Sequence, residues 1–422
     1  MAFNYEINQL ELMQARIKSV PHGWQFTYVG KAFCIRNNLR KPISEEERSM
    51  SPGNYPYYGP TKIQGYIGTF EQDGSYALIG EDGDHFLKFE KHSMTQLVDG
   101  KCTVNNHAHI IEGTKEASRE WFYYYFMHRD IFSFLSRQGA GRYKLNKASL
   151  EKMPLLLPPI VEQKKIAQIL STWDKAISVT EKLLANSQQQ KKALMQQLLT
   201  GKKRLLDENG VRFSGEWEYT IFGNLGDTYT GLTGKTKEDF GAGKPYIPYI
   251  NIFKNSRIDI QNLEYVQVND DERQSVVKYG DIFFTTSSET PEEVGMSSVL
   301  LEEVSEVFLN SFCFGFRLNN FETLIPKYAR YLFRSEHVRR QISTLGQGVT
   351  RYNLSKRQLI KLELKLPCVE EQQKIAAVLS AADAEISTLE KKLTCLRDEK
   401  KALMQQLLTG KRRVKVDEAV AE

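Results

Sequence analysis

A near-copy within the chain constrains its fold more than any other feature of the sequence. Residues 157–202 align without a gap on residues 366–411, at a constant offset of 209 residues and with 27 identities in 46 positions. The last twelve residues of each copy, KKALMQQLLTGK, are identical. Two copies this far apart are not the short period of a solenoid. They indicate that one half-molecule was duplicated.

Both copies are predicted to be long helices. After the opening prolines, neither copy contains Pro or Gly until its closing Thr-Gly, around which basic residues cluster. Gly past the end and cations in the last turn are the expected stop signals of a helix. Apolar residues recur with 4-3 spacing over about five heptads, which predicts a coiled-coil seam. Lys191 and Lys400 occupy equivalent seam positions, so we expect them to specify partner and register.

The length of these helices favours pairing with each other. A helix of about 38 residues is about 57 Å long at 1.5 Å per residue, longer than the domains between the copies. An antiparallel coiled coil is therefore the economical way to bury both seams. The alternative is that each helix is an amphipathic core helix of its own domain. The first seam is the more polar one, because Thr180 and Ser187 interrupt it.

Length and composition set the class of protein. A chain of 422 residues predicts two or three domains, and 41% hydrophobic residues suffice for real cores. No apolar run reaches membrane-spanning length and residues 1–13 carry no signal-peptide pattern, so we expect a cytoplasmic protein. The five cysteines are scattered without C-x-x-C, which fits a reducing compartment and argues against zinc. A net charge of +5 is compatible with nucleic acid without proving it.

The first globular segment is predicted to span residues 1–153, with strands at 26–29 and 76–79. A predicted loop at 54–68 mixes tyrosines, glycines, a lysine and a glutamine, which suits contact with phosphates and base edges as well as it suits a plain surface loop. Its candidate DNA contacts are Tyr57, Tyr58, Lys62 and Gln64. The aromatic run at 121–126 is expected in a helix, as core rather than as a base-stacking platform.

The repeat extends beyond the helices. Residues 139–146 (GAGRYKLN) match residues 348–355 (GVTRYNLS) at the same offset, aligning Gly139 on Gly348. The paired positions Arg142 with Tyr143 and Arg351 with Tyr352 suggest a phosphate clamp in each half. The alternative is a turn with a packed tyrosine and a solvated arginine.

The second globular segment is predicted to span residues 205–362. Its start resembles the first segment, with Trp217 aligned on Trp24 and Gly223 on Gly30, but the remainder differs. The duplication thus kept a frame and changed what the frame carries. A loop at 231–237 (GLTGKTK) lacks the first glycine of a phosphate-binding P-loop. The candidate DNA contacts of this segment are Lys235, Lys237, Lys244 and Lys254.

No catalytic constellation is found. The LPPI run at 157–160 lacks the aromatic residue of an amino-methyltransferase motif. His107 and His109 stand without further metal ligands. Glu363 and Lys365 form an E-x-K without the Pro-Asp partner of a nuclease, and the serines at 287–288 have no paired base.

The whole chain resembles the specificity (S) subunit of a type I restriction-modification system. The order of segments, the repeated EQ-x-K-I-A and LMQQLLTGK, the phrases PYYG and IQGYI, and GKPYIPYINI followed by GDIFFT carry the resemblance. It implies an α+β fold in which two globular mixed α/β target recognition domains are joined by two long helices. These helices form an antiparallel coiled coil with a pseudo-twofold internal repeat. The expected domains are residues 1–153, 154–204, 205–362 and 363–422.

The resemblance also implies a function. Each target recognition domain would read one half of a bipartite, asymmetric DNA site in the major groove, and the helices would dock two methyltransferase subunits and, through them, restriction subunits. The chain itself would be non-catalytic and hold no cofactor: S-adenosylmethionine belongs to the methyltransferase subunit, and ATP and Mg²⁺ to the restriction subunit. We expect partner contacts at the repeated Glu-Gln and Gln-Gln pairs, Glu162, Gln163, Gln196, Gln197, Glu371, Gln372, Gln405 and Gln406.

Two other classes of function remain open at this point. One is a structural coiled-coil adaptor with two protein-binding heads, and the other is a nuclease or methyltransferase with an unrecognised site. The logic of duplication favours DNA reading, because a repeated frame with two different heads suits an asymmetric split site and offers two equivalent surfaces to a repeated partner.

Overall fold

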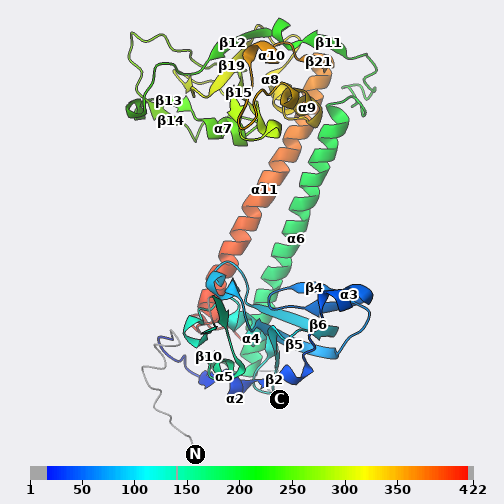
Figure 1. Ribbon diagram of the computed structural model, residues 1–422, viewed down its shortest axis with the longest axis vertical. Helices are drawn as coiled ribbons and strands as arrows, with labels where there is room; N and C mark the ends of the chain where they lie inside the picture. Colours follow the sequence, from blue (N-terminus) through cyan, green and yellow to red (C-terminus); the bar gives the residue numbers. More distant parts are fainter. Residues whose placement is uncertain (1–16, 139–140, 417–422) are drawn as a thin grey trace, which may run out of the picture. The chain divides into compact units, whose positions relative to one another are not determined.

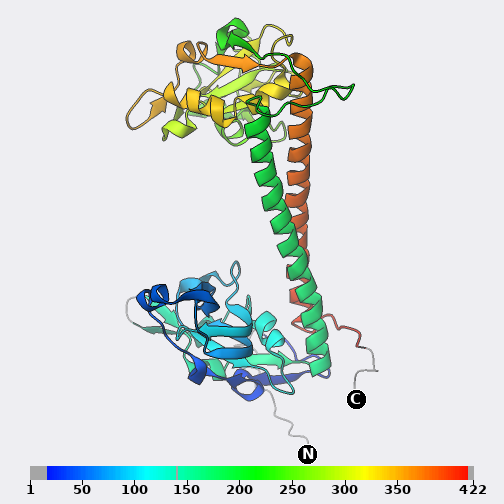
Figure 2. The same cartoon turned by 90° about the vertical axis from the view of Figure 1, so that its right-hand side faces the viewer.

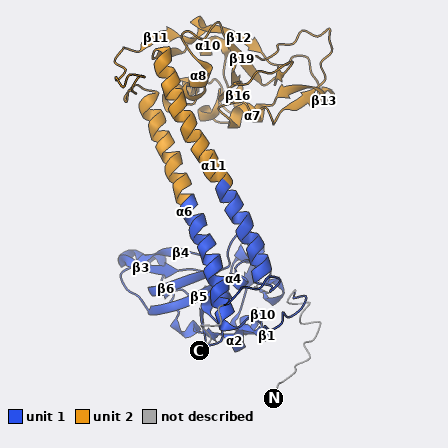
Figure 3. Cartoon of the chain, turned by 180° about the vertical axis from the view of Figure 1, so that it is seen from behind, with its two compact units in different colours: residues 1–180, 392–422 blue, residues 181–391 orange. Residues whose placement is uncertain are grey.

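The computed structural model describes residues 17–138 and 141–416 (Figure 1). Residues 1–16 of the first predicted domain, Gly139 of the predicted clamp and residues 417–422 lie outside the described residues. The chain divides into two compact units, shown in different colours in Figure 3. The first unit contains residues 1–180 and 392–422, and the second contains residues 181–391. Each unit therefore combines one globular head with parts of both repeated helices.

The first unit is built on a six-stranded sheet in the order β2-β7-β5-β6-β3-β4. Only β3 and β6 pair in parallel; the other neighbours are antiparallel. Helix α4 (Arg119–Phe126) begins at the capping hydroxyl of Ser118 and carries the aromatic run, whose side chains are mostly buried. The prediction that this run is core is confirmed. The strands are β2 (Cys34–Ile35), β3 (Pro52–Tyr58), β4 (Ile63–Ile67), β5 (Gln72–Gly80), β6 (Thr95–Val104) and β7 (Ala108–Glu112).

Smaller elements complete this head. The predicted strands at 26–29 and 76–79 correspond to β1 (Gln25–Tyr28), which pairs antiparallel with β10 (Pro154–Leu157), and to β5. The predicted loop at 54–68 is wrong, because β3 and β4 form an antiparallel hairpin there. The remaining elements are α2 (Val29–Ala32), η1 (Asn37–Leu39), α3 (Glu45–Met50), η2 (Asp84–Lys88), η3 (Phe132–Phe134), β8 (Ser136–Gln138), β9 (Arg142–Lys144) and α5 (Lys147–Glu151).

The second unit has two main sheets, beside the two-stranded pairs β11-β21 and β16-β20, in place of the single large one. A four-stranded antiparallel sheet has the order β12-β19-β15-β17, and a three-stranded sheet has the order β14-β13-β18. Its strands and helices are β11 (Glu218–Ile221), η4 (Phe222–Asn224), β12 (Gly226–Thr230), η5 (Lys237–Asp239), β13 (Phe240–Ile247), α7 (Tyr249–Lys254), β14 (Glu264–Val266), β15 (Ile282–Thr285), β16 (Ser287–Ser288), η6 (Pro291–Glu293), β17 (Ser297–Val299), β18 (Phe308–Leu309), β19 (Cys313–Leu318), α8 (Pro326–Leu332), α9 (Glu336–Thr344), β20 (Tyr352–Asn353), α10 (Lys356–Leu359) and β21 (Glu363–Leu366).

The repeated segments form the helices α6 (Ile160–Leu198) and α11 (Val369–Leu407), each of 39 residues. They run side by side in Figures 1 and 2. In the first unit, Ile166 near the start of α6 shares a core with Leu407 at the end of α11, and in the second unit Leu198 shares a core with Ile375. The predicted antiparallel pairing is therefore confirmed, and neither helix is confined to the core of one domain.

Each helix stops where the sequence predicts. Gly201 and Gly410 follow the last turns and adopt positive φ angles of 70° and 69°, which favour glycine over residues with a Cβ. Among the described residues, no helix has both the length and the apolar character needed to cross a membrane. All five cysteines are free thiols.

Candidate nucleic-acid interface and helix clamps

The repeated Arg-Tyr pair of the first unit lies on a short antiparallel hairpin. Strands β8 and β9 pair Arg137 with Tyr143 and Gln138 with Arg142. The ring of Tyr143 is half-buried, packs on the first core and lies 5.3 Å from the ring of Phe132. Arg142 is exposed. The hairpin thus uses its tyrosine as an anchor and leaves its arginine free to reach an anion.

A charged network fixes this hairpin to the sheet. The backbone N–H of Leu145 donates to the carbonyl of Glu81 at 2.7 Å, and the Glu81 carboxylate accepts from Arg40 and lies 3.3 Å from Lys144 Nζ. Burial raises the pKa of Glu81, but the hydrogen bond from Arg40 and neighbouring positive charge outweigh it, so the pKa lies below its ordinary value. Glu81 is therefore ionised at neutral pH.

His109 completes the network as a neutral group. Its Nε2 lies 2.7 Å from the carbonyl oxygen of Leu145. A carbonyl oxygen can only accept a hydrogen bond, so Nε2 carries the proton. Its Nδ1 accepts from the amide of Asn37 at 2.8 Å. Burial lowers the pKa of His109. The position of the hairpin thus depends on two titratable side chains, the partly buried Glu81 and the buried His109.

The second unit holds its Arg-Tyr pair on a comparable turn. Strand β20 pairs with β16, and an antiparallel bridge between Gln347 and Asn353 closes the loop. Gly348 has a φ of +138°, and a Cβ at this position would lie 2.0 Å from the carbonyl oxygen of Arg351, so the turn requires glycine. Arg351 is exposed, while Tyr352 is half-buried against the second core. Both halves therefore combine an outward arginine with an inward tyrosine.

The β3–β4 hairpin contains the other candidates of the first head. Tyr57 is 2% exposed and its hydroxyl accepts from the backbone N–H of Ile43 at 2.9 Å, so its assignment as a DNA contact is wrong. Tyr58 is half-buried, and the exposed Gln64 accepts from the amide of Asn105 at 3.1 Å. Lys62 is exposed at the hairpin tip. Tyr58, Lys62 and Gln64 stay predictions.

The lysines of the second head fall into two groups. The side chain of Lys235 is 6% exposed and donates to Glu272 at 2.7 Å, so its assignment as a DNA contact is wrong. The hydrogen bond from Lys235 is the main reason why the pKa of Glu272 falls to about 2. Lys244 is partly exposed and lies between two carboxylates, whereas Lys237 and Lys254 are exposed. Lys237, Lys244 and Lys254 stay predictions.

Four of the expected partner-binding residues are internal clamps instead. Glu162 is 3% exposed and accepts from Arg413 at 2.7 and 2.8 Å and from the indole of Trp24 at 3.0 Å. Glu371 is fully buried and accepts twice from Arg204 at 2.7 Å and from the indole of Trp217 at 3.2 Å. The assignment of Glu162 and Glu371 to a partner is wrong, because both carboxylates are saturated inside their own units.

The adjacent glutamines are buried as well. Gln163 accepts from the backbone N–H of Ser118 at 2.8 Å and donates to the carbonyl of Pro158 at 2.7 Å. Gln372 makes the equivalent bonds to Ile325 at 3.1 Å and Pro367 at 2.9 Å. Their assignment to a partner is also wrong. The Glu-Gln repeat fastens the start of each long helix to its head and to the end of the other helix.

Both seam lysines form an ion pair with the other long helix, and their role in setting partner and register stays a prediction. Lys400 lies 2.5 Å from Asp174 in the first unit, and Lys191 lies 2.5 Å from Asp383 in the second. The carboxylates Asp174 and Asp383 also accept from tyrosine hydroxyls, at 2.8 and 2.7 Å. Sequence reasoning missed these aspartates and the clamp arginines. Their signal was their offset of 209, which relates 174 to 383 and 204 to 413.

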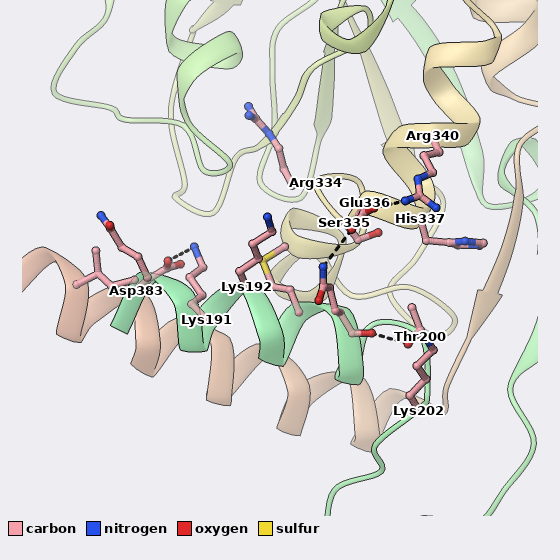
Figure 4. A pocket seen from close by; sticks show the side chains of 14 residues that line it. Lys191, Lys192, Thr200, Lys202, Arg334, Ser335, Glu336, His337, Arg340 and Asp383 are labelled. Carbon is pink, nitrogen blue, oxygen red and sulfur yellow. Dashed lines mark hydrogen bonds and ion pairs between the residues drawn. The ribbon is translucent and has the colours of Figure 1, made fainter. Parts of the chain in front are cut away.

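The other four expected partner contacts are accessible. Gln196, Gln197, Gln405 and Gln406 are exposed on the last turns of α6 and α11. In the second unit, Gln196 donates to Glu336 of α9 at 3.1 Å, at the edge of a groove of about 1090 Å³ (Figure 4). The groove is bounded by Lys192, Thr200 and Lys202 on one side and by the start of α9 on the other. These four glutamines stay predictions.

The described residues offer no metal centre. No group of three or more His, Cys, Asp or Glu side chains within residues 17–138 and 141–416 is arranged to hold a metal ion. His107, one of the two histidines considered from sequence, pairs with Asp82 at 2.8 Å, and His109 belongs to the hairpin network. Both histidines therefore have roles in the packing of the first unit.

Comparison with known proteins agrees with this geometry. The family model "Type I restriction modification DNA specificity domain" matches residues 21–186 and 215–395. A putative type I restriction enzyme specificity subunit of Haemophilus influenzae is 38% identical over 136 residues, 32% of this chain and 34% of that protein, so the match spans about a third of that relative. The specificity subunit of the type I restriction enzyme MjaVIII of Methanocaldococcus jannaschii is 24% identical over 433 residues, 98% of each chain.

A solved structure shares the fold along nearly the full length. The crystal structure of a type I restriction-modification S subunit from M. genitalium has a TM-score of 0.60 at 15% identity, over 93% of this chain and 97% of that one. The two matches to the family model each contain one globular head and the larger part of one long helix. The chain therefore belongs to the family of the type I restriction modification DNA specificity domain and carries this domain twice.

Proposed function

We propose that the chain is the DNA sequence-recognition subunit of a type I restriction-modification complex and that it reads a bipartite, asymmetric site. One observation carries the proposal. Both units keep the same clamp, seam and Arg-Tyr hairpin, while their heads are built on different sheets. A common frame with two different heads suits the reading of two different half-sites, in which Arg142 and Arg351 hold phosphates and the heads read bases.

The exposed face of the identical twelve-residue ends supports two equivalent docking sites. Upstream of them, most exposed positions differ between the repeats, for example Lys175 against Ala384 and Gln188 against Arg397. Within them, every exposed position is the same in both copies: Lys192, Ala193, Gln196, Gln197, Thr200 and Lys202 correspond to Lys401, Ala402, Gln405, Gln406, Thr409 and Lys411. Packing accounts for the identical buried leucines but not for these residues. A shared partner that binds both ends accounts for them.

The partner that fits is a pair of methyltransferase subunits, and restriction subunits would join through them. Under this proposal the chain performs no catalysis and binds no cofactor, so S-adenosylmethionine, ATP and Mg²⁺ act on the partner subunits. The complex works on double-stranded DNA in the cytoplasm. The competing function, a coiled-coil adaptor, gives no reason related to DNA for the difference between the two heads.

Methylation mapping tests the proposal. The chain is produced with the methyltransferase subunit of its own system, and methylated adenines are mapped in the host genome. A bipartite motif with different halves is expected, and exchanging residues 205–362 for those of a relative should change one half only. Methylation without a motif would contradict DNA reading, and a change of both halves together would contradict the assignment of one half to each unit.

A second measurement tests the absence of catalysis. The purified chain alone is incubated with DNA and either Mg²⁺ or S-adenosylmethionine. No cleavage and no methyl transfer are expected. Turnover by the chain alone that persists when contaminating enzymes are controlled for would support an unrecognised active site instead.

A further inference from the structure

Phe312 is an exposed aromatic residue on a rigid turn of the second unit. The side chain is 60% exposed although it is large and apolar. The turn between β18 and β19 is fixed by a hydrogen bond from Cys313 N–H to the carbonyl of Asn310 at 3.1 Å and by the Asn310 side chain, which accepts from Phe312 N–H at 2.8 Å. The hydrogen-bonded backbone of this turn therefore holds the ring toward solvent.

The same turn is hydrogen-bonded to Thr286, directly before β16, and β16 pairs with β20 at the Arg351–Tyr352 turn. The carbonyl of Phe312 accepts from both the backbone N–H and the hydroxyl of Thr286, at 3.0 and 2.8 Å. The carbonyl of Thr286 in turn accepts from Leu354 N–H at 2.8 Å, and Ser287 pairs with Asn353. Phe312 is thus only one strand away from the turn that presents Arg351.

Two further segments bring exposed apolar side chains to this region. Tyr249, the first residue of α7, donates its hydroxyl to the carbonyl of Ser287 at 3.0 Å, and the following Ile250 is 46% exposed. Val349, in the turn between Gly348 and Arg351, is 90% exposed. Figure 3 shows α7 next to β16. Three hydrogen-bonded segments of the second unit therefore each carry an exposed apolar side chain, and one of them also carries Arg351.

A large apolar side chain held exposed on a fixed turn, close in the hydrogen-bond network to an exposed arginine, suits a contact surface. The arginine suits a phosphate, and the C5-methyl of thymine is the apolar group that duplex DNA offers to such a ring in the major groove. We propose that Phe312 is a specificity-determining residue of the second unit, whose ring contacts a thymine methyl while Arg351 holds the neighbouring phosphate. This inference rests on the proposed function.

Removal of single methyl groups from the DNA tests the contact directly. The complex of the chain with its methyltransferase subunits is titrated with duplexes that carry the mapped site. Each thymine of the second half-site is replaced in turn by deoxyuridine, which lacks only the methyl group. The wild-type complex is expected to bind one of these duplexes about fourfold more weakly, as the loss of one buried methyl predicts.

The Phe312→Ala complex is expected to bind that duplex and the thymine duplex equally. Phe321→Ala is the matched control, because Phe321 is 41% exposed in the loop that follows β19, whereas Phe312 precedes this strand. It should keep the wild-type dependence. Phe312→Asn provides a second truncation that suits a turn, and circular dichroism confirms that each variant is folded.

Two results would overturn the inference. One is a Phe312→Ala complex that still distinguishes thymine from deoxyuridine, and the other is a wild-type complex that is indifferent to every such replacement in the second half-site, as an unstacking wedge would be. Both leave the proposed function standing, provided that the wild-type complex prefers its mapped site over unrelated DNA. Absence of that preference would contradict the proposed function itself.

Discussion

The two glutamate clamps predict an unequal response to the same substitution. Glu371 is fully buried and its partner Arg204 has a side chain only 21% exposed, whereas the partner of Glu162, Arg413, is 43% exposed. Replacing the carboxylate by an amide keeps the shape, removes the charge and leaves the arginine without its counter-ion. The cost depends on how well water can reach that arginine.

The magnitudes follow from this difference in exposure. Breaking a buried pair costs about 3–5 kcal/mol, and we expect Glu371→Gln to lower the free energy of unfolding of the second unit by about 3 kcal/mol because Arg204 keeps some contact with water. We expect Glu162→Gln to cost about 1–2 kcal/mol in the first unit, where two charge-assisted hydrogen bonds are lost but Arg413 is rehydrated. The exposed Glu363→Gln on β21 is the control and should cost less than about 0.5 kcal/mol.

Urea unfolding followed by hydrogen exchange measures each unit separately, since every unit yields its own peptides. The order Glu371→Gln, Glu162→Gln, Glu363→Gln is the test, because absolute values vary with context. If Glu371→Gln costs no more than the exposed control, the clamps do not stabilise the helix pair. If Glu162→Gln is the more costly of the two, exposure of the arginine does not decide the energy.

Four further predictions address binding, geometry, assembly and pH. Arg142→Ala should weaken binding to all DNA sequences and lower the slope of log affinity against log salt by about one, and an unchanged slope would refute the phosphate contact. Four residues are inserted between Ser187 and Lys191, and four between Asp383 and Ser387 to keep the pairing, which adds about 6 Å to each helix. The mapped gap between half-sites should then grow by one or two base pairs. A folded, active variant with the original gap would show that the helices do not set the spacing. Residues 1–204 contain both Asp174 and Lys191, so two copies of this fragment should form a dimer through α6 in sedimentation experiments. The substitution Lys191→Asp should weaken the dimer, and Lys191→Asp combined with Asp174→Lys should restore it. A monomeric fragment would show that the repeats are not interchangeable. Burial lowers the pKa of His109 in the folded state, so the unfolded chain binds more protons below the ordinary pKa of about 6.5, and the first unit loses stability as the pH is lowered below that value. This loss should be smaller in His109→Gln, and identical pH profiles of the two proteins would refute the role of His109.

The sequence predicts the helices well and the heads only in part. Local information suffices for α6 and α11, because period and stop signals lie within each segment, and Lys191 and Lys400 both pair with the other helix. The sequence predicts a loop in place of the β3–β4 hairpin, because glycines and prolines hide the alternation of a strand. The arrangement of the two main sheets of the second unit depends on pairings between distant segments, which no local pattern specifies.

The errors at the site have one physical cause. Identity between repeats shows that a residue is constrained, but it does not distinguish a constraint from inside the fold from one imposed by a partner. Glu162 binds Arg413 across 251 residues of sequence, and Glu371 binds Arg204 across 167. Only the three-dimensional structure shows that these glutamates are buried while Gln196 and Gln405, on the same helices, are not.

The composition of the first unit has a consequence for how the chain is made. Ile166 and Leu170 of α6 pack with Leu407 and Leu408, which a ribosome adds more than 200 residues later. At about 5–20 residues per second, that interval lasts roughly 10–50 s. The second unit, which needs nothing beyond residue 391, is complete before the first. The head synthesised first therefore completes its core only when the C-terminal end of α11 is made, and until then the apolar face at the start of α6 has no partner helix.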